Sequence, residues 1–382
     1  MLVISTNICA QSNEITHTQD VIPAIMQFSF NIIHHEMADG KNIVLSPFLM
    51  HNTLTLLANG SNGKTLQELE DVLGTNKSIL TDYYKNINIW NESLRGCNSF
   101  WFEENIKVNQ QFSDICHNFA ETEIKHVDFS QKTIEDSINI WIERKTNYAI
   151  KNMILGINPT NKLVIANTIY FLSNWYYPFP KEKNVTNSFF LSNKKKEKTI
   201  YMNNCDNYQY FQDKHAQGLI LPYEDTDFSF LAILPNKNIT VSDYITSLNS
   251  LDLLNNVNNA KYEMVDLYLP KFKIMSKLSL DNTFKKMGII EAFNPVHADF
   301  SGMAEISDSL YLEIILQNTF IHVLEDGTEA SSAVVTFLDG HRASEKIKPK
   351  KIEFNRPFVF CIIENNSKTP LFIGIMENPL DE

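Results

Sequence analysis

The short segment from Glu325 to Ala333 is the feature that most constrains how this chain can fold. It contains only Glu, Asp, Gly, Thr, Ala and Ser, and apolar sequence flanks it, Leu310 to Val323 before it and Phe358 to Met376 after it. A loop that only stays solvated does not need such small side chains. A segment that slides as a strand into a packed sheet does need them, because bulky or charged inward side chains would stop it. The composition therefore predicts an insertable segment with a functional role.

The alternation of side chains along this segment fits the same prediction. In a strand, successive side chains point to opposite faces. One face would receive small or β-branched residues, namely Thr328, Ala330, Ser332, Val334 and Thr336. The opposite face would receive Glu329, Ser331, Ala333 and Val335. We expect Glu325 and Glu329 to face solvent on that second side, and Gly327 to permit the sharp bend at which insertion starts.

The composition indicates one large domain. The chain has 382 residues, of which 43% are hydrophobic and 11% aromatic, enough for a large core. No internal repeat and no Gly/Ser-rich or Pro-rich linker divides it. We therefore expect a single domain over residues 22–382, preceded by an N-terminal extension, residues 1–21, that is at most a weak or atypical signal segment.

Charge and cysteine content exclude several classes of partner. A net charge of -12 is unsuitable for binding nucleic acid, which needs clustered Lys and Arg. No segment is long and apolar enough for a membrane span. Five scattered cysteines without a CxxC pair indicate neither a disulfide framework nor a metal site, and Cys361 has the apolar surroundings of a buried thiol. No metal and no cofactor is expected.

The cellular compartment is the least constrained property. Six Asn-X-Ser/Thr sequons begin at Asn59, Asn76, Asn91, Asn184, Asn238 and Asn365. In a chain so rich in Asn, chance supplies several of them, so they favour secretion only weakly. We expect an extracellular, secreted protein, with a cytoplasmic location as the alternative.

Periodicity predicts helices early in the chain and strands mostly later. Pro23 suits the first turn of a helix that stops before Gly40, and Ser46 followed by Pro47 predicts a capped helix start. Thr65 and Glu68 form a capping-box pattern. The segments expected as strands are Leu163 to Phe171, Leu219 to Leu221, Phe228 to Leu234, Phe358 to Ile363 and Leu371 to Ile375. The absence of βαβ alternation points to an α+β fold.

No catalytic motif supports an enzyme. His35-Glu36 is followed by Asp39 and not by a second histidine, so the zinc-protease spacing fails. The segment Asn59 to Gly63 lacks the GxSxG arrangement of hydrolases, and neither GxGxxG nor a P-loop is present. The remaining histidines lack carboxylate or cysteine partners at ligand spacing. We expect the protein not to be an enzyme.

An ordered series of motifs resembles the serpins, a family of suicide-substrate protease inhibitors. The series covers the chain from about residue 22 to its end. Its members are Asn42 to Pro47, Asn167 to Phe171, Trp175, Pro178-Phe179, Leu269 to Lys273, Met287 to Ile289, Ala298 to Met303, Phe354 to Phe358 and Leu371 to Gly374. Any one of these could occur by chance, but their order is hard to obtain otherwise.

The resemblance implies a fold and a set of functional residues. The fold would have three β-sheets, about eight or nine helices and an exposed reactive-centre loop at about 325–350. The loop's hinge would comprise Glu325, Gly327, Thr328, Glu329, Ala330, Ser331, Ser332 and Ala333. Trp175 would lie at the breach, where the loop enters the central sheet. Ser46, Asn167 and Gln317 would lie in the shutter, the cluster beneath the strands that separate.

The resemblance also implies a mechanism and a partner. A target serine protease would cleave the loop, form a covalent acyl complex and be trapped when the loop inserts as a strand into the sheet. The inhibitor would act as a monomer. Family spacing places the scissile bond at His341-Arg342, whereas Arg342-Ala343 suits the acidic pocket of a trypsin-like protease. We favour Arg342-Ala343; cleavage after His341 would fit a chymotrypsin-like or cathepsin-type target.

Three positions depart from the family pattern. Gln317 replaces a histidine, Leu49 replaces a serine, and Ala149 replaces a glycine. Because an amide both donates and accepts hydrogen bonds, Gln317 predicts a rewired shutter and not a lost one. The alternative function within the same fold is that of a non-inhibitory serpin, a carrier or chaperone.

Overall fold

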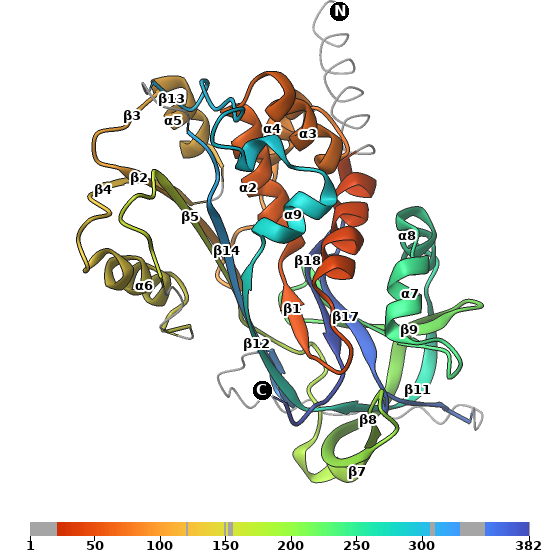
Figure 1. Cartoon of the computed structure of the whole chain (residues 1–382). Coiled ribbons are helices and arrows are strands. Elements are labelled where there is room, and N and C mark those ends of the chain that lie inside the picture. The colour runs from red at the N-terminus through yellow and green to blue at the C-terminus, as the bar shows by residue number, and fades with distance from the viewer. Residues whose placement is uncertain are drawn as a thin grey trace, which may run out of the picture.

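A computed structural model describes residues 21–119, 121–148, 150–151, 156–305, 310–328 and 348–381. Within these ranges the chain forms nine α-helices and three β-sheets of nine, seven and two strands. The fold is therefore α+β, and the expected numbers of helices and sheets are confirmed. Figure 1 shows most of the helices gathered at one end of the molecule, with α7 and α8 beside the larger sheet.

The seven-stranded sheet contains the start of the segment that the sequence predicts to be insertable. Its order is β4-β2-β5-β14-β15-β6, and β12 pairs with β14. The bounds are β4 (Thr122–Val127), β2 (Leu94–Glu103), β5 (Leu163–Phe171), β14 (Ile314–Val323), β15 (Gly327–Thr328), β6 (Ser173–Asn174) and β12 (Phe272–Ser279). The central strands β5 and β14 run parallel, with Thr319 beside Ile169 and Gln317 beside Asn167.

The other two sheets complete the framework. The larger has the order β1-β18-β17-β10-β9-β8-β11-β16, with β7 on β8, and the smaller pairs β13 with β3. Their bounds are β1 (Ile43–Leu45), β18 (Pro370–Met376), β17 (Phe358–Glu364), β10 (Phe228–Pro235), β9 (Ala216–Pro222), β8 (Lys196–Gln212), β11 (Lys261–Pro270), β16 (Lys350–Glu353), β7 (Val185–Phe190), β13 (Ala304–Glu305) and β3 (Lys107–Val108). The strands expected from apolar runs are all present.

The first helix covers residues 21–36 and ends before the turn at Gly40. The others are α2 (Pro47–Asn59), α3 (Gly63–Leu73), α4 (Lys77–Asn86), α5 (Gln110–His117), α6 (Ile134–Lys145), α7 (Val241–Ser247), α8 (Ser250–Asn258) and α9 (Asp281–Met287). Short 3₁₀ turns span Lys181–Lys183 and Glu291–Phe293. Of the two helix starts predicted at Ser46 and at Thr65, the first is confirmed and the second is wrong. Ser46 caps α2 as expected, by accepting a hydrogen bond from the Leu49 N–H.

The capping box predicted at Thr65 and Glu68 is wrong. Helix α3 begins three residues earlier than predicted, with Asn62 in place of Thr65 at its N-cap position, so Thr65 lies inside the helix. The Thr65 hydroxyl instead accepts a hydrogen bond from the Asp299 backbone, and the Glu68 carboxylate accepts from the backbone N–H groups of Ile290 and Glu291. Both side chains bind a distant segment, which local spacing does not reveal.

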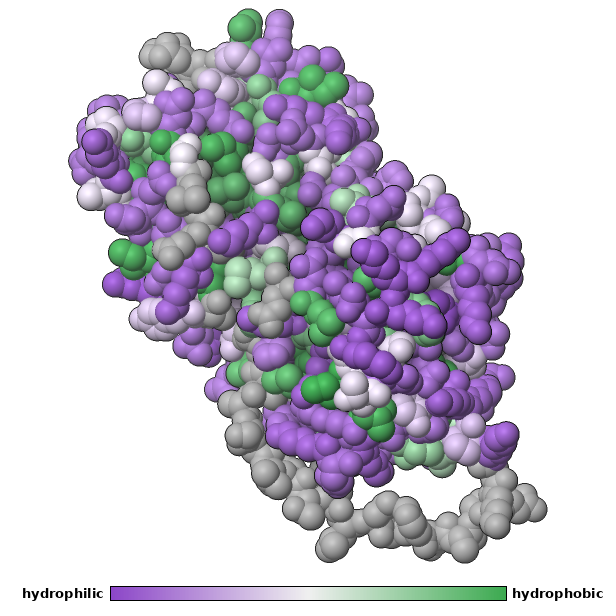
Figure 2. Space-filling model, turned by 60° about the horizontal axis from the view of Figure 1, so that its bottom comes forward, coloured by the Kyte–Doolittle hydropathy of each residue, from purple (hydrophilic) through white to green (hydrophobic). Residues whose placement is uncertain are grey.

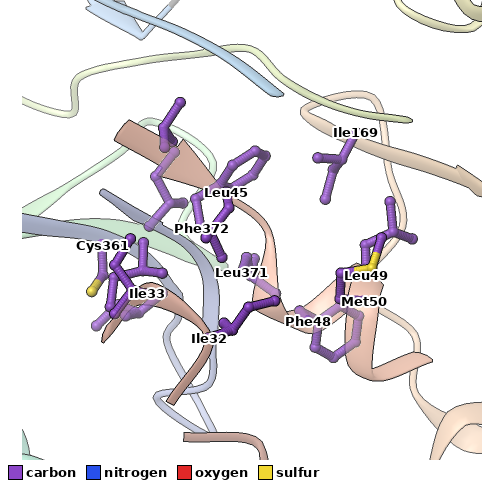
Figure 3. Packing of buried hydrophobic residues seen from close by; sticks show 14 of the residues in the cluster. Ile32, Ile33, Leu45, Phe48, Leu49, Met50, Ile169, Cys361, Leu371 and Phe372 are labelled. Carbon is purple, nitrogen blue, oxygen red and sulfur yellow. The ribbon is translucent and has the colours of Figure 1, made fainter. Parts of the chain in front are cut away.

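Two hydrophobic clusters lie on opposite faces of the seven-stranded sheet. The smaller is formed between the sheet and α6, with Trp141 and Ile138 against Val164 and Ala166. The larger extends from Val21 to Met376 and contains the buried side of α2. Figure 1 shows α6 on one side of β5 and β14, and α2 on the other. Figure 3 shows part of the larger cluster, including Ile32, Ile33, Leu45, Phe48, Leu49, Met50, Ile169, Leu371 and Phe372.

None of the helices in the described ranges is both long and apolar enough to cross a membrane.

Candidate functional site: the loop hinge and the sheet beneath it

The start of the predicted hinge is already part of the seven-stranded sheet. Gly327 and Thr328 form β15, which lies between β14 and β6. Thr328 pairs with Val323 of β14 and with Ser173 of β6, antiparallel in both cases. The last strand residue before the undescribed part of the loop therefore lies at the head of the boundary between β5 and β14.

Thr328 is buried at this point, as an inward-facing hinge residue should be. Its side chain is 1% exposed, and its hydroxyl lies 2.6 Å from the hydroxyl of Tyr223. Burial raises the pKa of Tyr223, so the phenol stays neutral and available as a hydrogen-bonding partner. The sequence did not single out Tyr223, because nothing near it in the chain indicates that its hydroxyl meets the hinge.

Trp175, the residue predicted for the breach, contacts the segment predicted as the hinge at several points. Its indole N–H donates to the Leu324 carbonyl at 2.8 Å, and its backbone N–H donates to the Asp326 carbonyl at 2.9 Å. The indole stacks on Tyr223, with ring centroids 4.7 Å apart and planes 7° from parallel. The carbonyls of Leu324 and Asp326 thus bind the same tryptophan. Tyr223, which stacks on that tryptophan, also contacts the Thr328 hydroxyl.

Glu325 corrects one expectation. Its side chain is only 5% exposed and does not face solvent. It accepts a hydrogen bond from the Asn184 amide and forms an ion pair with Lys271 at 3.1 Å. Burial alone would raise the pKa of Glu325, but the bonds from Asn184 and Lys271 and the Lys271 charge outweigh it and hold the pKa below its ordinary value. Glu325 is therefore an ionised anchor of the hinge.

Gly327 is required for a different reason from the predicted bend. Its φ lies outside the left-handed region, so no special backbone conformation demands glycine. A Cβ at this position would instead lie 2.2 Å from the Ser173 carbonyl oxygen and 2.6 Å from the Asn174 Cα. The backbones of β15 and β6 approach too closely for any side chain.

The shutter residues Ser46 and Gln317 form a direct clamp. The Ser46 backbone N–H donates to the Gln317 Oε1 at 2.9 Å, and the Gln317 amide donates to the Ser46 carbonyl at 2.8 Å. The Ser46 hydroxyl donates to the Leu371 carbonyl at 2.7 Å. One amide side chain thus bonds both backbone groups of the α2 N-cap, as a rewired cluster would require, and the role of this cluster as a shutter stays a prediction.

Asn167 belongs to a neighbouring polar cluster that the sequence did not reveal. Its amide donates to the hydroxyl of Thr53 at 2.6 Å and to the Asn98 Oδ1. The Asn98 amide in turn donates to Asn52 at 2.8 Å. All four side chains are buried. Asn52 and Thr53 lie on α2 and Asn98 on β2, and helical spacing alone does not place them together.

The remaining predicted site residues lie outside the described residues. These are Glu329, Ala330, Ser331, Ser332, Ala333, His341, Arg342 and Ala343, and the departure at Ala149 also lies outside them. Leu49 is buried in the larger cluster and takes no part in the shutter through its side chain. Within the described ranges, no group of three or more His, Cys, Asp or Glu side chains is arranged to hold a metal ion.

The described residues thus form an α+β fold in which the start of the predicted hinge is a strand of the sheet that contains the parallel pair β5 and β14. The family model described as "Serpin (serine protease inhibitor)" matches residues 23–379. The chain therefore belongs to the serpin family, whose members are generally protease inhibitors and not catalysts.

Curated relatives span most of the chain. An uncharacterized serpin-like protein of Thermococcus kodakarensis is 30% identical and is aligned over 94% of this chain and 86% of its own length. A serine protease inhibitor of Cyanea capillata is also 30% identical, over 89% of this chain and 93% of its own length.

Solved structures share the fold. The thermophilic serpin tengpin in its native state gives a TM-score of 0.87 at 30% identity, with 94% of each chain covered. Its latent state gives 0.79 at 29% identity, covering 94% of this chain and 97% of that one. Thyroxine-binding globulin in complex with thyroxine gives 0.83 at 25% identity, covering 95% of this chain and all of that one.

Proposed function

We propose that this protein is an irreversible suicide-substrate inhibitor of a serine protease, trypsin-like in specificity. The observation that carries the proposal is the position of β15 at the head of the boundary between β5 and β14. The relative from Cyanea capillata, named as a serine protease inhibitor, and the closer likeness to the native than to the latent state of tengpin support the same function.

The register of β15 supports insertion without any sliding of the sheet. Thr328 lies opposite both Val323 and Ser173. If both pairings continue without a bulge, Ser332 would lie between Thr319 and Ile169, and Val334 between Gln317 and Asn167. Thr319 and Ile169 are already neighbours in the sheet, as are Gln317 and Asn167. The two strands therefore need only to separate by one strand spacing, about 4.8 Å.

The side chains assigned to the buried face suit this register. Thr328 faces the larger core, and every second residue after it would do the same. These residues are small or β-branched, and none of them carries a charge. Ser332 would meet the Thr319 hydroxyl, which is buried without a hydrogen-bond partner within the described part of the chain. Insertion would supply that partner.

We propose Arg342-Ala343 as the scissile bond. The serine Oγ of the protease would attack the Arg342 carbonyl carbon, the bond to the Ala343 nitrogen would break with proton transfer to that nitrogen, and an acyl ester would remain. Insertion before water attacks the ester would trap the protease covalently. His341-Arg342 remains the alternative bond, for a chymotrypsin-like or cathepsin-type protease.

The test is to incubate the purified protein with a protease panel and look for a complex stable to detergent. We expect a covalent complex with a trypsin-like protease, and fragment masses that place the cut after Arg342. Thr328→Arg should give cleaved inhibitor and free protease instead, because a charge at this already buried position of β15 would prevent the residues after it from continuing the strand into the sheet. Thr328→Ser is the matched control and should keep the complex. A Thr328→Arg variant that traps as well as the wild type would refute insertion at this hinge.

A carrier function is the second candidate, because the fold is shared with thyroxine-binding globulin. The hinge favours inhibition, since Ala330 to Val335 contains neither a charge nor a proline. Failure of the whole panel to form a complex, together with an unchanged melting temperature after the loop is nicked, would favour the carrier.

The domain boundaries, the oligomeric state and the cellular compartment are further proposals. We propose a single domain over 22–382 after the extension 1–21, active as a monomer. The one face that Figure 2 shows is mostly hydrophilic, as expected of a surface that faces solvent in a monomer. We also propose secretion. Of the sequon asparagines, Asn238 is exposed, whereas Asn184 is bonded to the buried Glu325. A glycan on Asn238 after expression in a eukaryotic secretory pathway would support secretion, and a glycan-free intracellular product would refute it.

A further inference from the structure

A pocket of about 410 Å³ is lined by residues that belong to neither the hinge nor the shutter, although Tyr176 directly follows Trp175 in the chain. Strands β8, β9 and β10 form its floor through residues that share one face, because Gln209 pairs with Ile220 and Pro222 pairs with Ser229. Its size lies within the range of small-molecule sites, about 300–1,000 Å³. No step of the proposed inhibition uses it.

Tyrosine rings surround the opening. Tyr176, Tyr177 and Tyr262 line the pocket, and their exposed fractions are 41%, 42% and 72%. The first two form an edge-to-face pair with centroids 4.7 Å apart. The Tyr176 backbone N–H donates to the Pro222 carbonyl at 3.0 Å, which fixes the pair against the sheet. Exposed tyrosine rings around a hollow are suited to stacking on a flat ligand.

The opposite wall is also held in place. Asn365 lies in the turn between β17 and β18, and its backbone N–H and side-chain amide donate to the carbonyls of Asp227 and Thr226, at 2.8 Å and 2.7 Å. The turn between β17 and β18 is thereby joined to the turn between β9 and β10. The pocket is built from rigid elements and does not depend on a loop closing over it.

Lys368 is the one charged residue that lines the pocket, and its ammonium group has no partner within the described residues. Burial lowers its pKa, partly opposed by the charge of Glu364. Glu364 does not pair with it, because the carboxylate accepts hydrogen bonds from the backbone N–H groups of Asn366 and Ser367 and from the Ser367 hydroxyl. A half-buried cation that forms no direct ion pair within the described residues is suited to bind an anion.

The backbone at Lys368 is also unusual. Its φ of 62° is in the left-handed region, which a lysine rarely adopts, and its N–H closes the turn by donating to the Glu364 carbonyl at 2.8 Å. Such strain persists where the surrounding structure enforces it and is concentrated at functional sites. The turn therefore fixes the backbone from which the Lys368 side chain extends at the pocket.

We propose that this pocket binds a small aromatic carboxylate. The tyrosine rings stack on the aromatic part, Lys368 pairs with the carboxylate, and the amides of Asn207 and Gln209 are available to a polar substituent on the ring. The proposal does not depend on protease inhibition, since it rests on residues outside the hinge and the shutter.

The experiment compares three probes by titration calorimetry and ligand-observed NMR: 3-(4-hydroxyphenyl)propionate, its neutral amide, and tyramine. We expect the carboxylate to bind about tenfold more tightly than the amide, as one charge-assisted hydrogen bond implies, and tyramine to bind most weakly. Lys368→Gln should remove the difference between carboxylate and amide. Lys237→Gln, an exposed lysine elsewhere, is the matched control and should preserve it.

A second variant keeps the proposal falsifiable if Lys368→Gln fails to fold. Tyr262 is exposed, so Tyr262→Ala should leave the fold intact and weaken the carboxylate and the amide alike. Absence of binding at millimolar concentration, equal affinity for carboxylate and amide, preference for tyramine, or unchanged binding to Tyr262→Ala would each overturn the proposal.

Discussion

At the scale of single residues, His51 shows how burial makes stability depend on pH. Its ring is completely buried, with Nδ1 2.9 Å from the Tyr84 hydroxyl and Nε2 3.1 Å from the Leu73 carbonyl. Burial lowers its pKa to about 4, although the Leu73 carbonyl opposes the shift. The folded protein therefore holds this histidine neutral at a pH where an unfolded chain already binds a proton.

The direction in which stability changes with pH follows from the difference between the folded and unfolded pKa values of His51. Because the folded pKa lies below the unfolded value of 6.5, protonation favours the unfolded chain, and stability falls as the pH drops from about 6.5 towards 4. At pH 5 the loss from this one residue is about 2 kcal/mol relative to pH 7. His51→Gln should reduce the loss by that amount in urea unfolding at the two pH values. The exposed control His117→Gln should not. Equal pH dependence in wild type and His51→Gln would refute this role.

The residue scale is also where prediction from the sequence succeeds or fails most clearly. Ser46 was predictable as a cap because its partner lies three residues away. Glu325, Gly327 and Thr65 were assigned wrong environments because their partners lie far away in the chain, at Lys271, Ser173 and Asp299. Local chemistry identifies which residues are unusual, but tertiary contacts decide what they do.

At the scale of elements, alternation and pairing register determine which loop positions tolerate bulk. Ser332 would lie between Thr319 and Ile169, both almost completely buried. Its neighbour Ser331 would point to the opposite face, beside Tyr170 and Phe320, which are partly exposed. Two adjacent serines thus provide a matched pair of positions in which only the direction of the side chain differs.

We expect Ser332→Arg to convert the protein from an inhibitor into a substrate, whereas Ser331→Arg should still trap the protease. The measurement is the number of inhibitor molecules consumed for each protease molecule inactivated. That number should rise several-fold for Ser332→Arg and stay near the wild-type value for Ser331→Arg. The reverse order would show that the inserted strand is shifted by one residue relative to β15.

Element-scale prediction from sequence was more successful than residue-scale prediction. Continuous apolar runs identified β5, β10, β17 and β18, since strands buried on both faces have few polar residues. The two-residue strands β6 and β15 carry no such pattern. These short strands depend on distant contacts, since Val323 pairs with Thr328 and the Trp175 backbone N–H donates to the Asp326 carbonyl. They form the region predicted as the breach. The order of motifs indicated the candidate site, but the strand pairing around it could be seen only in the structure.

At the scale of the whole molecule, the proposal requires that the intact fold is not the most stable arrangement of the chain. An inserted strand would gain backbone pairing on both sides and bury its inward side chains. For about a dozen residues this releases on the order of 10 kcal/mol. With unfolding entropy near 2.1 cal/mol/K for each of 382 residues, that gain corresponds to a rise in melting temperature of roughly 10 °C.

Limited cleavage near Arg342 should therefore raise the melting temperature of the wild-type protein, because the freed segment can enter the sheet. The same cleavage in Ser332→Arg should raise it much less, since the charged side chain stops insertion at Thr319. Differential scanning calorimetry of intact and nicked samples of both proteins measures the two shifts side by side. If nicked and intact wild-type protein melted at the same temperature, insertion of the loop would not stabilise the fold. Insertion would then release no free energy to drive the trapping of a protease.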